Sequence, residues 1–414
     1  MTLVTDPARP ITISELEIEK YLLFLEKFLG SKDIDRRIDQ VERTVRFEQD
    51  QTVYLRYWVF PNAYFWLGIR DVRSLVLSGK CRTGNLPSRV QKVLEIAAKL
   101  HKLQGSMSDR VQDEFRTRIL GSDFPAPTLY EIDTAGHFWQ LGYEVRWCDP
   151  PEVPGERIPE FVAYSSTHEF EVECKSESMD SGRRILRPRF YRLVDRLAAP
   201  LSSEGFMGGI KISVATEMPA DAGWQVQLVE AVRKAVEEYS DHVELEDETF
   251  IDIDLHNVGD MLIPQENLDA DIQAIKTPYS YIAVFCKQYG GTPVNPLIVK
   301  MESRSKDRFL KKVFDDLKEA NRQFSGERAA LICCFLPEVD SFDNLGTQSA
   351  LSNMTFHFLR HHARPYVFAV SYTSESISMH AGSQITTSSP SITFENPYYD
   401  DDFGPRVSVY SGTC

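Results

Sequence analysis

The stretch PEFVAYSSTHEFEVECK, from Pro159 to Lys175, decides how this sequence is interpreted. Its second half alternates apolar and charged residues, which is typical of a β-strand because successive side chains of a strand point to opposite faces. One face carries Phe170, Val172 and Cys174, and the other carries Glu169, Glu171, Glu173 and Lys175. The first half begins with Pro159 and Glu160 and is predicted to pair with the second half as a hairpin.

The pairing of these two strands can bring Glu160 next to Glu173. Two adjacent carboxylates suit Mg²⁺, which takes oxygen ligands from one or two carboxylates together with water and substrate phosphate. Lys175 follows roughly 7 Å along the same face of the strand. Its side chain can orient or help deprotonate an attacking water molecule, and it can stabilise charge on phosphorus.

The residues alone leave a second interpretation open. An acidic residue two positions before a lysine occurs by chance in a chain of this length, and Asp316 and Lys318 repeat the spacing inside a predicted helix. A strand with one face in solvent shows the same alternation as Glu169–Lys175. The hairpin is therefore either a metal site or an ordinary half-exposed pair of strands.

A third carboxylate precedes the hairpin. Glu131 lies in TLYEIDTAGHFWQL, a predicted helix that ends at Gly142, and YEVRW from Tyr143 to Trp147 follows as the first strand. This helix can pack across the sheet with Glu131 directed at the same metal. The sequence thus predicts three carboxylates and one lysine around a single position.

This order of elements, a helix with Glu131, a strand, a hairpin with PE and ECK, and then a helix, resembles the PD-(D/E)xK nuclease superfamily. The resemblance covers about Thr128 to Thr216, through a predicted helix over 185–198 and a strand over 208–216. It implies a restriction-endonuclease-like α/β fold, a mixed sheet flanked by helices. Glu160 stands at the first acidic position of the motif, where aspartate is commoner, Glu173 stands at the second and Lys175 at the lysine.

The resemblance implies an enzyme, a Mg²⁺-dependent phosphodiester hydrolase with Mn²⁺ as a substitute metal. The catalytic residues would be Glu160, Glu173 and Lys175, and the metal ligands would be Glu160, Glu173 and Glu131. DNA is the expected substrate because the superfamily mostly cuts DNA, in restriction, phage defence or repair. The alternative is a catalytically inactive nuclease-fold protein that serves as a protein- or nucleic-acid-binding module.

The chain length of 414 residues predicts two or three domains. We expect a mostly helical domain over residues 1–122. An α/β domain follows over 123–375, with an acidic excursion near 241–275, because helices and strands alternate there. The boundary is placed in GSDFPAPT, from Gly121 to Thr128, and an irregular polar and acidic tail is expected over 376–414.

The N-terminal region contains two clear helical patterns. SELEIEKYLLFLEKFLG begins with a capping box of Ser14 and Glu17 and stops at Gly30. Its apolar residues repeat at helical spacing, namely Leu16, Tyr21, Leu22, Leu25 and Phe28. A second helix is predicted over 88–103. Between them, TVYLRYWVFPNAYFWLG over 52–68 is rich in aromatic and β-branched residues and predicts a hairpin broken at Pro61 and Asn62.

The net charge of −15 argues against a protein that coats nucleic acid, so any binding surface must be local. The segment from Arg183 to Arg196 carries six arginines and one acidic residue directly after the hairpin. We expect phosphate contacts from Arg183, Arg184, Arg187 and Arg189. A second basic cluster over 300–312 is interpreted first as the exposed face of a helix.

The first residues contain no secretory signal, and the longest apolar runs are too short to cross a membrane. The seven cysteines have no CxxC spacing and are expected to be reduced. A cytoplasmic protein without membrane partners is therefore expected. A protein partner or a homo-oligomer is a further possibility, and in the binding-module alternative the acidic stretch or the N-terminal helices would bind a protein partner.

Overall fold

The structure is a computed structural model of the 414-residue chain. It describes residues 13–47, 52–79, 86–121, 125–149, 158–178, 180–276, 280–289, 292–337, 350–361, 364–379, 385–388, 390–404 and 407. The described residues form an α/β protein with two mixed sheets and a helical N-terminal region. The α/β prediction is confirmed at this level. The expected domain boundary at 122/123 lies outside the described residues.

The first sheet contains the hairpin. Its strand order is β1 (Glu144–Trp147), β2 (Phe161–Tyr164), β3 (Glu169–Ser176), β9 (Ala329–Phe335), β10 (Val367–Thr373) and β13 (Ser391–Glu395). The first three strands are antiparallel, whereas β3, β9 and β10 run parallel and β13 is antiparallel to β10. Strand β9 is buried along its whole length, as expected for a central strand covered on both faces.

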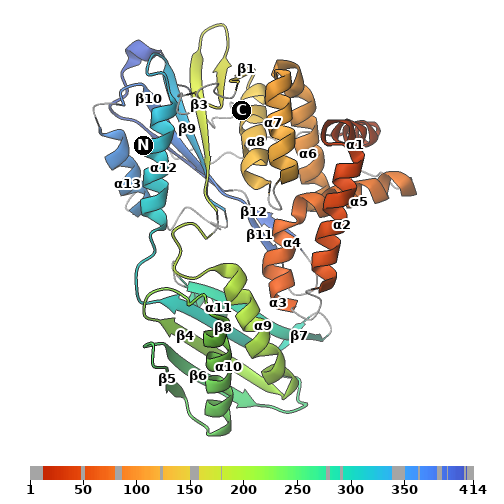
Figure 1. The fold of residues 1–414 in the computed structure, drawn as a ribbon, viewed down its shortest axis with the longest axis vertical. Coiled ribbons are helices and arrows are strands. Elements are labelled where there is room, and N and C mark those ends of the chain that lie inside the picture. The colour runs from red at the N-terminus through yellow and green to blue at the C-terminus, as the bar shows by residue number, and fades with distance from the viewer. Residues whose placement is uncertain are drawn as a thin grey trace.

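Helices cover both faces of this sheet (Figure 1). On one face lie the N-terminal helices and α8 (Ala126–Gln140), whose core includes Phe138, Phe170 and Val172. On the other face lie α12 (Phe309–Gln323) and α13 (Ala350–Leu359), with Leu317 and Ile332 in their core. Both faces of the middle of β3, from Phe170 to Cys174, are therefore buried.

The second sheet is inserted in the chain between β3 and α12. Its strand order is β5 (His242–Glu244), β6 (Phe250–Asn257), β4 (Phe206–Val214), β8 (Thr292–Ser303) and β7 (Ser280–Tyr289). It is packed with α9 (Arg187–Ser203) and α10 (Ala222–Glu237), and α11 (Leu268–Ile275) precedes β7. We call residues 177–308, which contain these elements, the inserted module.

The inserted module corrects two expectations. The predicted strand over 208–216 is present as β4, but it pairs with β6 and β8 and does not join the sheet of the hairpin. The acidic stretch over 241–275 is not an excursion, because it supplies β5 and β6 at one edge of the second sheet. Sequence order does not reveal which of two sheets a strand joins.

The N-terminal region is helical, as predicted. It comprises α1 (Glu15–Leu29), α2 (Ser31–Phe47), α3 (Thr52–Tyr54), the π-helix η1 (Leu55–Val59), α4 (Phe60–Asn62), α5 (Tyr64–Ser78), α6 (Ser88–Leu103), η3 (Gln104–Ser106) and α7 (Asp109–Gly121). The capping box of Ser14 and Glu17 is present, and Gly30 ends α1 with a φ of 89°. Leu16 does not belong to the buried face of α1, since it is 91% exposed and Ile18 is buried in its place.

The prediction of a hairpin over 52–68 is wrong, because this segment is helical from α3 into α5. Its aromatic and β-branched residues favour a strand locally, but their tertiary contacts favour a helix. Val53, Tyr54 and Val59 pack into the core of the inserted module. The buried carboxylate of Asp195 on α9 accepts hydrogen bonds from the backbone N–H groups of Val53 and Tyr54, at 2.8 and 2.9 Å.

The expected irregular tail is also wrong in part. Ser391–Glu395 forms β13 at the edge of the first sheet, and Asn396 and Tyr399 are buried behind it. The remaining tail elements are the ribbon of β11 (Ser376–Met379) and β12 (Ile385–Ser388), and η5 (Asp401–Phe403). In the part of the chain that the structure describes, every helix is too short or too polar to cross a lipid bilayer.

Candidate active site

The register of the hairpin places Glu160 opposite Glu173. Phe161 at the start of β2 pairs with Val172 on β3, so the preceding residue, Glu160, lies across from the following one, Glu173. The backbone N–H of Glu160 donates a hydrogen bond to the Glu173 carboxylate. The predicted proximity of these two carboxylates is therefore present in the structure.

Glu131 joins them from α8. Gly136 allows α8 to approach α6 closely, because a Cβ there would lie 2.6 Å from the Lys99 side chain. Glu131 is 4% exposed, and its carboxylate is paired with Arg118 on α7. The negative charge of Glu160 acts on Glu131 more strongly than that of any other carboxylate. A helix and the two arms of the hairpin that follows it thus direct carboxylates to one place.

Because the three carboxylates are buried close to one another, their pKa values are raised and they resist ionisation. Burial raises the pKa of Glu131 to about 8, with a further contribution from the charge of Glu160. Burial also raises the pKa of Glu173 to about 8, and again the charge of Glu160 adds to the effect. The pKa of Glu160 itself is raised by burial. A cation at this position would relieve the repulsion among the three groups.

Lys175 lies beside this cluster and carries a firmly held proton. Its Nζ is 2.9 Å from Oε1 of Glu173 and 3.4 Å from Oε1 of Glu319 on α12. Burial alone would lower the pKa of Lys175, but the charges of Glu173 and Glu319 outweigh it and raise the pKa. The lysine is therefore an ammonium ion at neutral pH.

The donor set suits Mg²⁺, although the side chains are not arranged around a metal. Among the residues that the structure describes, no group of three or more His, Cys, Asp or Glu side chains has the geometry to hold a metal ion. Arg118 and Lys175 pair with the carboxylates instead. Within the same residues, however, Oε2 of Glu131 is buried without a hydrogen-bond partner. The carboxylate oxygens are thus of the donor type that a hard divalent cation takes, whereas their arrangement is that of ion pairs with Arg118 and Lys175.

The arginines that were expected to bind phosphate have other contacts. Arg183 pairs with Asp307 at 3.0 Å, and Arg184 lies 3.8 Å from Glu217. Arg187 is 2% exposed, and its guanidinium packs over the rings of Trp58 and Tyr281.

The prediction for Arg187 is therefore wrong, because a buried arginine cannot reach a phosphate in solvent. Its place in the core follows from α9 packing on the second sheet. Arg189 is half-buried and stays a prediction.

Sequence reasoning missed Arg118 and Glu319. Arg118 lies thirteen residues before Glu131 on a different helix, and no motif links the two. Glu319 was detectable in principle. The apolar run of β9 predicts a central strand, and the helix before a central parallel strand crosses the sheet beside the strand it pairs with. Since β9 pairs with β3, α12 lies next to Lys175.

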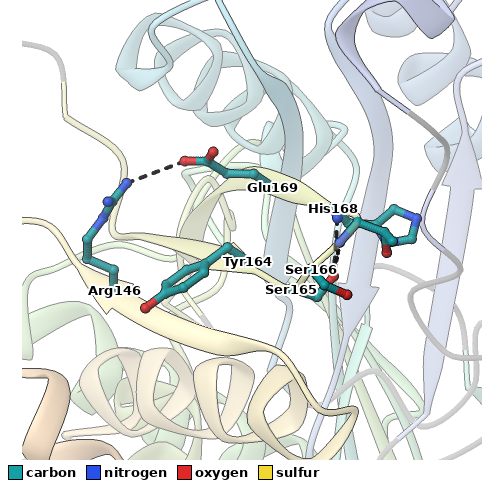
Figure 2. Close-up of a pocket in the computed structure, with 7 residues that line it drawn as sticks. Arg146, Tyr164, Ser165, Ser166, His168 and Glu169 are labelled. Atoms are coloured by element: carbon teal, nitrogen blue, oxygen red, sulfur yellow. Dashed lines mark hydrogen bonds and ion pairs between the residues drawn. The ribbon is translucent and has the colours of Figure 1, made fainter.

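A polar pocket lies at the opposite end of the same hairpin (Figure 2). Arg146 and Glu169 form an ion pair across it at 3.4 Å, and Ser165 and His168 lie in the turn. The full lining consists of Arg146, Tyr164, Ser165, Ser166, Thr167, His168 and Glu169. The length of β2, roughly 13 Å, separates this turn from Glu160, so the pocket is distinct from the carboxylate cluster.

The chain matches no protein-family model, no curated protein and no solved structure in the comparisons with known proteins. Its function must therefore be argued from the carboxylate cluster and its surroundings.

Proposed function

We propose that this protein is a metal-dependent nuclease that hydrolyses phosphodiester bonds in DNA. The observation that carries the proposal is the side-by-side placement of Glu160 and Glu173 on the hairpin, with Lys175 in contact with Glu173. The buried carboxylate of Glu131 on α8 joins the same cluster. The substrate is named as DNA because the resemblance to the PD-(D/E)xK superfamily implies it.

The topology of the first sheet supports the proposal. Helix α8 is followed by the antiparallel strands β1, β2 and β3, in the order that the resemblance required. The matching region is shorter than expected, since the chain leaves the first sheet after β3 and returns with α12 and β9. The inserted module therefore interrupts the proposed nuclease domain immediately after Lys175.

The side chains have distinct roles in this proposal. Glu160, Glu173 and Glu131 would hold Mg²⁺, which supplies positive charge at the phosphate and lowers the pKa of a bound water molecule. Lys175, protonated at neutral pH, would orient that water and stabilise negative charge on the phosphate in the transition state. Its raised pKa argues against a role as the general base.

A second candidate function is a binding module without catalysis. It is favoured by the pairing of Arg118 with Glu131 and by the absence, among the described residues, of three carboxylates arranged for a metal. In this case the fold persists as a scaffold, and Arg118 and Lys175 neutralise the buried carboxylates permanently. The two candidates differ in whether a divalent cation displaces these contacts.

The test is incubation of the purified protein with plasmid, linear duplex DNA, single-stranded DNA and RNA, each with Mg²⁺, Mn²⁺ or EDTA. The nuclease proposal expects cleavage of DNA with either metal and none with EDTA. Lys175→Ala serves as the control for a contaminating nuclease, since it should remove the activity. Absence of cleavage under all conditions, with a folded protein, would favour the binding module.

A further inference from the structure

The chain enters the inserted module after β3 and leaves it before α12, and hydrogen bonds join these two connecting segments. Arg308 donates its backbone N–H to the carbonyl of Gly182 at 2.7 Å, and Asp307 accepts from the backbone N–H of Arg184 at 2.9 Å. Gly182 has a φ of 66°, and a Cβ there would lie 2.7 Å from the Arg308 backbone. The chain from 304 to 312 is therefore fixed in place directly before and within the first turn of α12.

Four cationic residues extend into solvent from this fixed segment. They are Lys306, Arg308, Lys311 and Lys312, and all four are exposed. Among the described residues, the side chains of Lys306, Arg308 and Lys311 form no ion pair with a carboxylate, whereas Lys312 pairs with Asp316 and Glu177. We call these four residues the α12 basic surface.

The α12 basic surface borders the candidate active site. Glu177 follows Lys175 by two residues, and its Oε1 lies 3.9 Å from Nζ of Lys312. About two turns further along α12, Glu319 contacts Lys175 itself. The basic surface and the carboxylate cluster are therefore connected through contacts between α12 and β3.

Pairing with Asp316 four residues further along α12 accounts for Lys312, but helix stability does not explain Lys306 and Arg308, which precede the helix. The start of a helix carries a partial positive charge, so cations there are unfavourable and carboxylates are favourable. The first turn of α12 nevertheless has no acidic residue. A local excess of positive charge is also unusual in a chain whose net charge is −15. An anionic partner would offset the mutual repulsion of these side chains.

We propose that the α12 basic surface holds the sugar–phosphate backbone of the nucleic acid and leads it to the carboxylate cluster. This inference rests on the proposed nuclease function, and it moves the backbone contacts from the arginines of 183–189 to residues 306–312. Lysine and arginine contacts of this kind position the nucleic acid without reading its sequence. The surface therefore predicts binding that depends strongly on salt and weakly on sequence.

The test compares two variants with equal loss of charge. The first replaces Lys306, Arg308 and Lys311 with Gln, which keeps the backbone contact between Arg308 and Gly182. The control replaces Lys20, Lys32 and Arg233 with Gln, three exposed cations on α1, α2 and α10. Binding of duplex DNA and of single-stranded RNA is measured in EDTA, so that no cleavage occurs, over a series of salt concentrations.

Each phosphate contact contributes about 0.9 to the slope of log affinity against log salt for duplex DNA. The α12 variant is expected to make this slope shallower by roughly 2 to 3. The control is expected to keep the slope of the wild type. Loss of slope with DNA or with RNA supports the surface and identifies its nucleic acid. Equal slopes for both variants and the wild type, or no binding by the wild type, overturn it.

Failure of the nuclease proposal has a different signature. A wild-type protein that never cleaves with Mg²⁺, but whose salt slope falls in the α12 variant, refutes the nuclease and retains the surface as a nucleic-acid contact. A wild-type protein that cleaves, with an unchanged slope in the α12 variant, retains the nuclease and refutes the surface.

Discussion

Each of the two sheets carries a glutamate and a lysine two residues apart on one strand, but the charged groups around the two pairs differ. In the first sheet, Glu173 and Lys175 lie two residues apart on β3, with side chains 3% and 18% exposed. In the second sheet, Lys300 and Glu302 lie two residues apart on β8, and Glu302 also pairs with Lys211 on β4 at 2.9 Å.

The pKa of Glu302 and the pKa of Glu173 are shifted in opposite directions. Burial would raise the pKa of Glu302, but hydrogen bonds from Lys211 and Lys300 outweigh it and lower the pKa. Burial raises the pKa of Glu173 to about 8, the charge of Glu160 adds to this effect, and the contact with Lys175 does not offset it. The second sheet therefore holds an ion network in which the carboxylate is readily ionised, whereas the first holds carboxylates that resist ionisation in the absence of a cation.

The largest effect expected from this difference is on cleavage. Glu173→Gln should reduce the rate of DNA cleavage with Mg²⁺ by at least about a hundredfold, since it removes a charged group that acts in the transition state. Glu302→Gln should leave the rate unchanged, because its carboxylate belongs to a satisfied network. The measurement is the initial rate of plasmid cleavage by the two variants, with circular dichroism to confirm folding.

The contrast between the two sheets is refuted if the two variants have the same cleavage rate. A wild-type cleavage rate in Glu173→Gln would show that Glu173 is not a ligand of the catalytic metal. An equally large loss in Glu302→Gln would show that charge on either sheet affects the fold or the substrate in the same way.

The second effect is on the stability of the metal-free protein. A carboxylate whose folded-state pKa is raised is most favourable to folding when protonated, so stability is lost as the pH rises from about 4.5 towards 8. Glu160→Gln removes one of the three repelling charges. We expect it to raise Tm at pH 8.5 and to have less effect at pH 5, where the three carboxylates are mostly protonated.

The effect of Mg²⁺ on Tm should also depend on pH. Binding to protonated carboxylates must release protons, so Mg²⁺ should raise Tm of the wild type more at pH 8.5 than at pH 6. Glu302→Gln is the matched control, because the lowered pKa of Glu302 means that its ionised form supports folding. A metal-free Glu160→Gln protein with the pH dependence of the wild type would show that the cluster is not strained by its own charge.

Local patterns in the sequence predicted the first sheet of the site well. The alternation of Glu169–Lys175 placed Glu173 and Lys175 on one face, and the hairpin placed Glu160 across from them. These are contacts between residues close in sequence, where the period of a strand fixes which side chains meet. The helical glutamate Glu131 followed from its position before β1 and also reaches the cluster.

Contacts over long separations were not predictable in the same way. The arginines of 183–189 follow Lys175 closely in sequence, but the chain enters the second sheet there, and Arg187 is buried beneath Trp58 and Tyr281. The aromatic segment over 52–68 favours a strand by propensity, yet Asp195 holds its start as a helix. In both cases the decisive contacts come from residues about 90 or more positions away in the sequence.

The smallest effect concerns Glu319, which contacts Lys175 from outside the first sheet. Glu319 is 60% exposed and lies 3.4 Å from Lys175, so its contact is screened by solvent and is worth less than about 1 kcal/mol. Glu319→Gln should therefore reduce the cleavage rate by no more than about fivefold at neutral pH. Asp315→Asn, which breaks an exposed ion pair with Lys318 on the same helix, should leave the rate unchanged.

The pH profile distinguishes positioning of Lys175 from a general effect on α12. Glu319 helps to raise the pKa of Lys175, so its removal should allow the lysine to lose its proton at a lower pH. The alkaline decline of the cleavage rate in Glu319→Gln should consequently move to lower pH relative to the wild type, while Asp315→Asn should keep the wild-type profile. If both variants shift equally, Glu319 acts only through the stability of α12. If neither shifts, Glu319 does not contribute to the pKa of Lys175, and the charge of Glu173 on the same strand is what holds its ammonium.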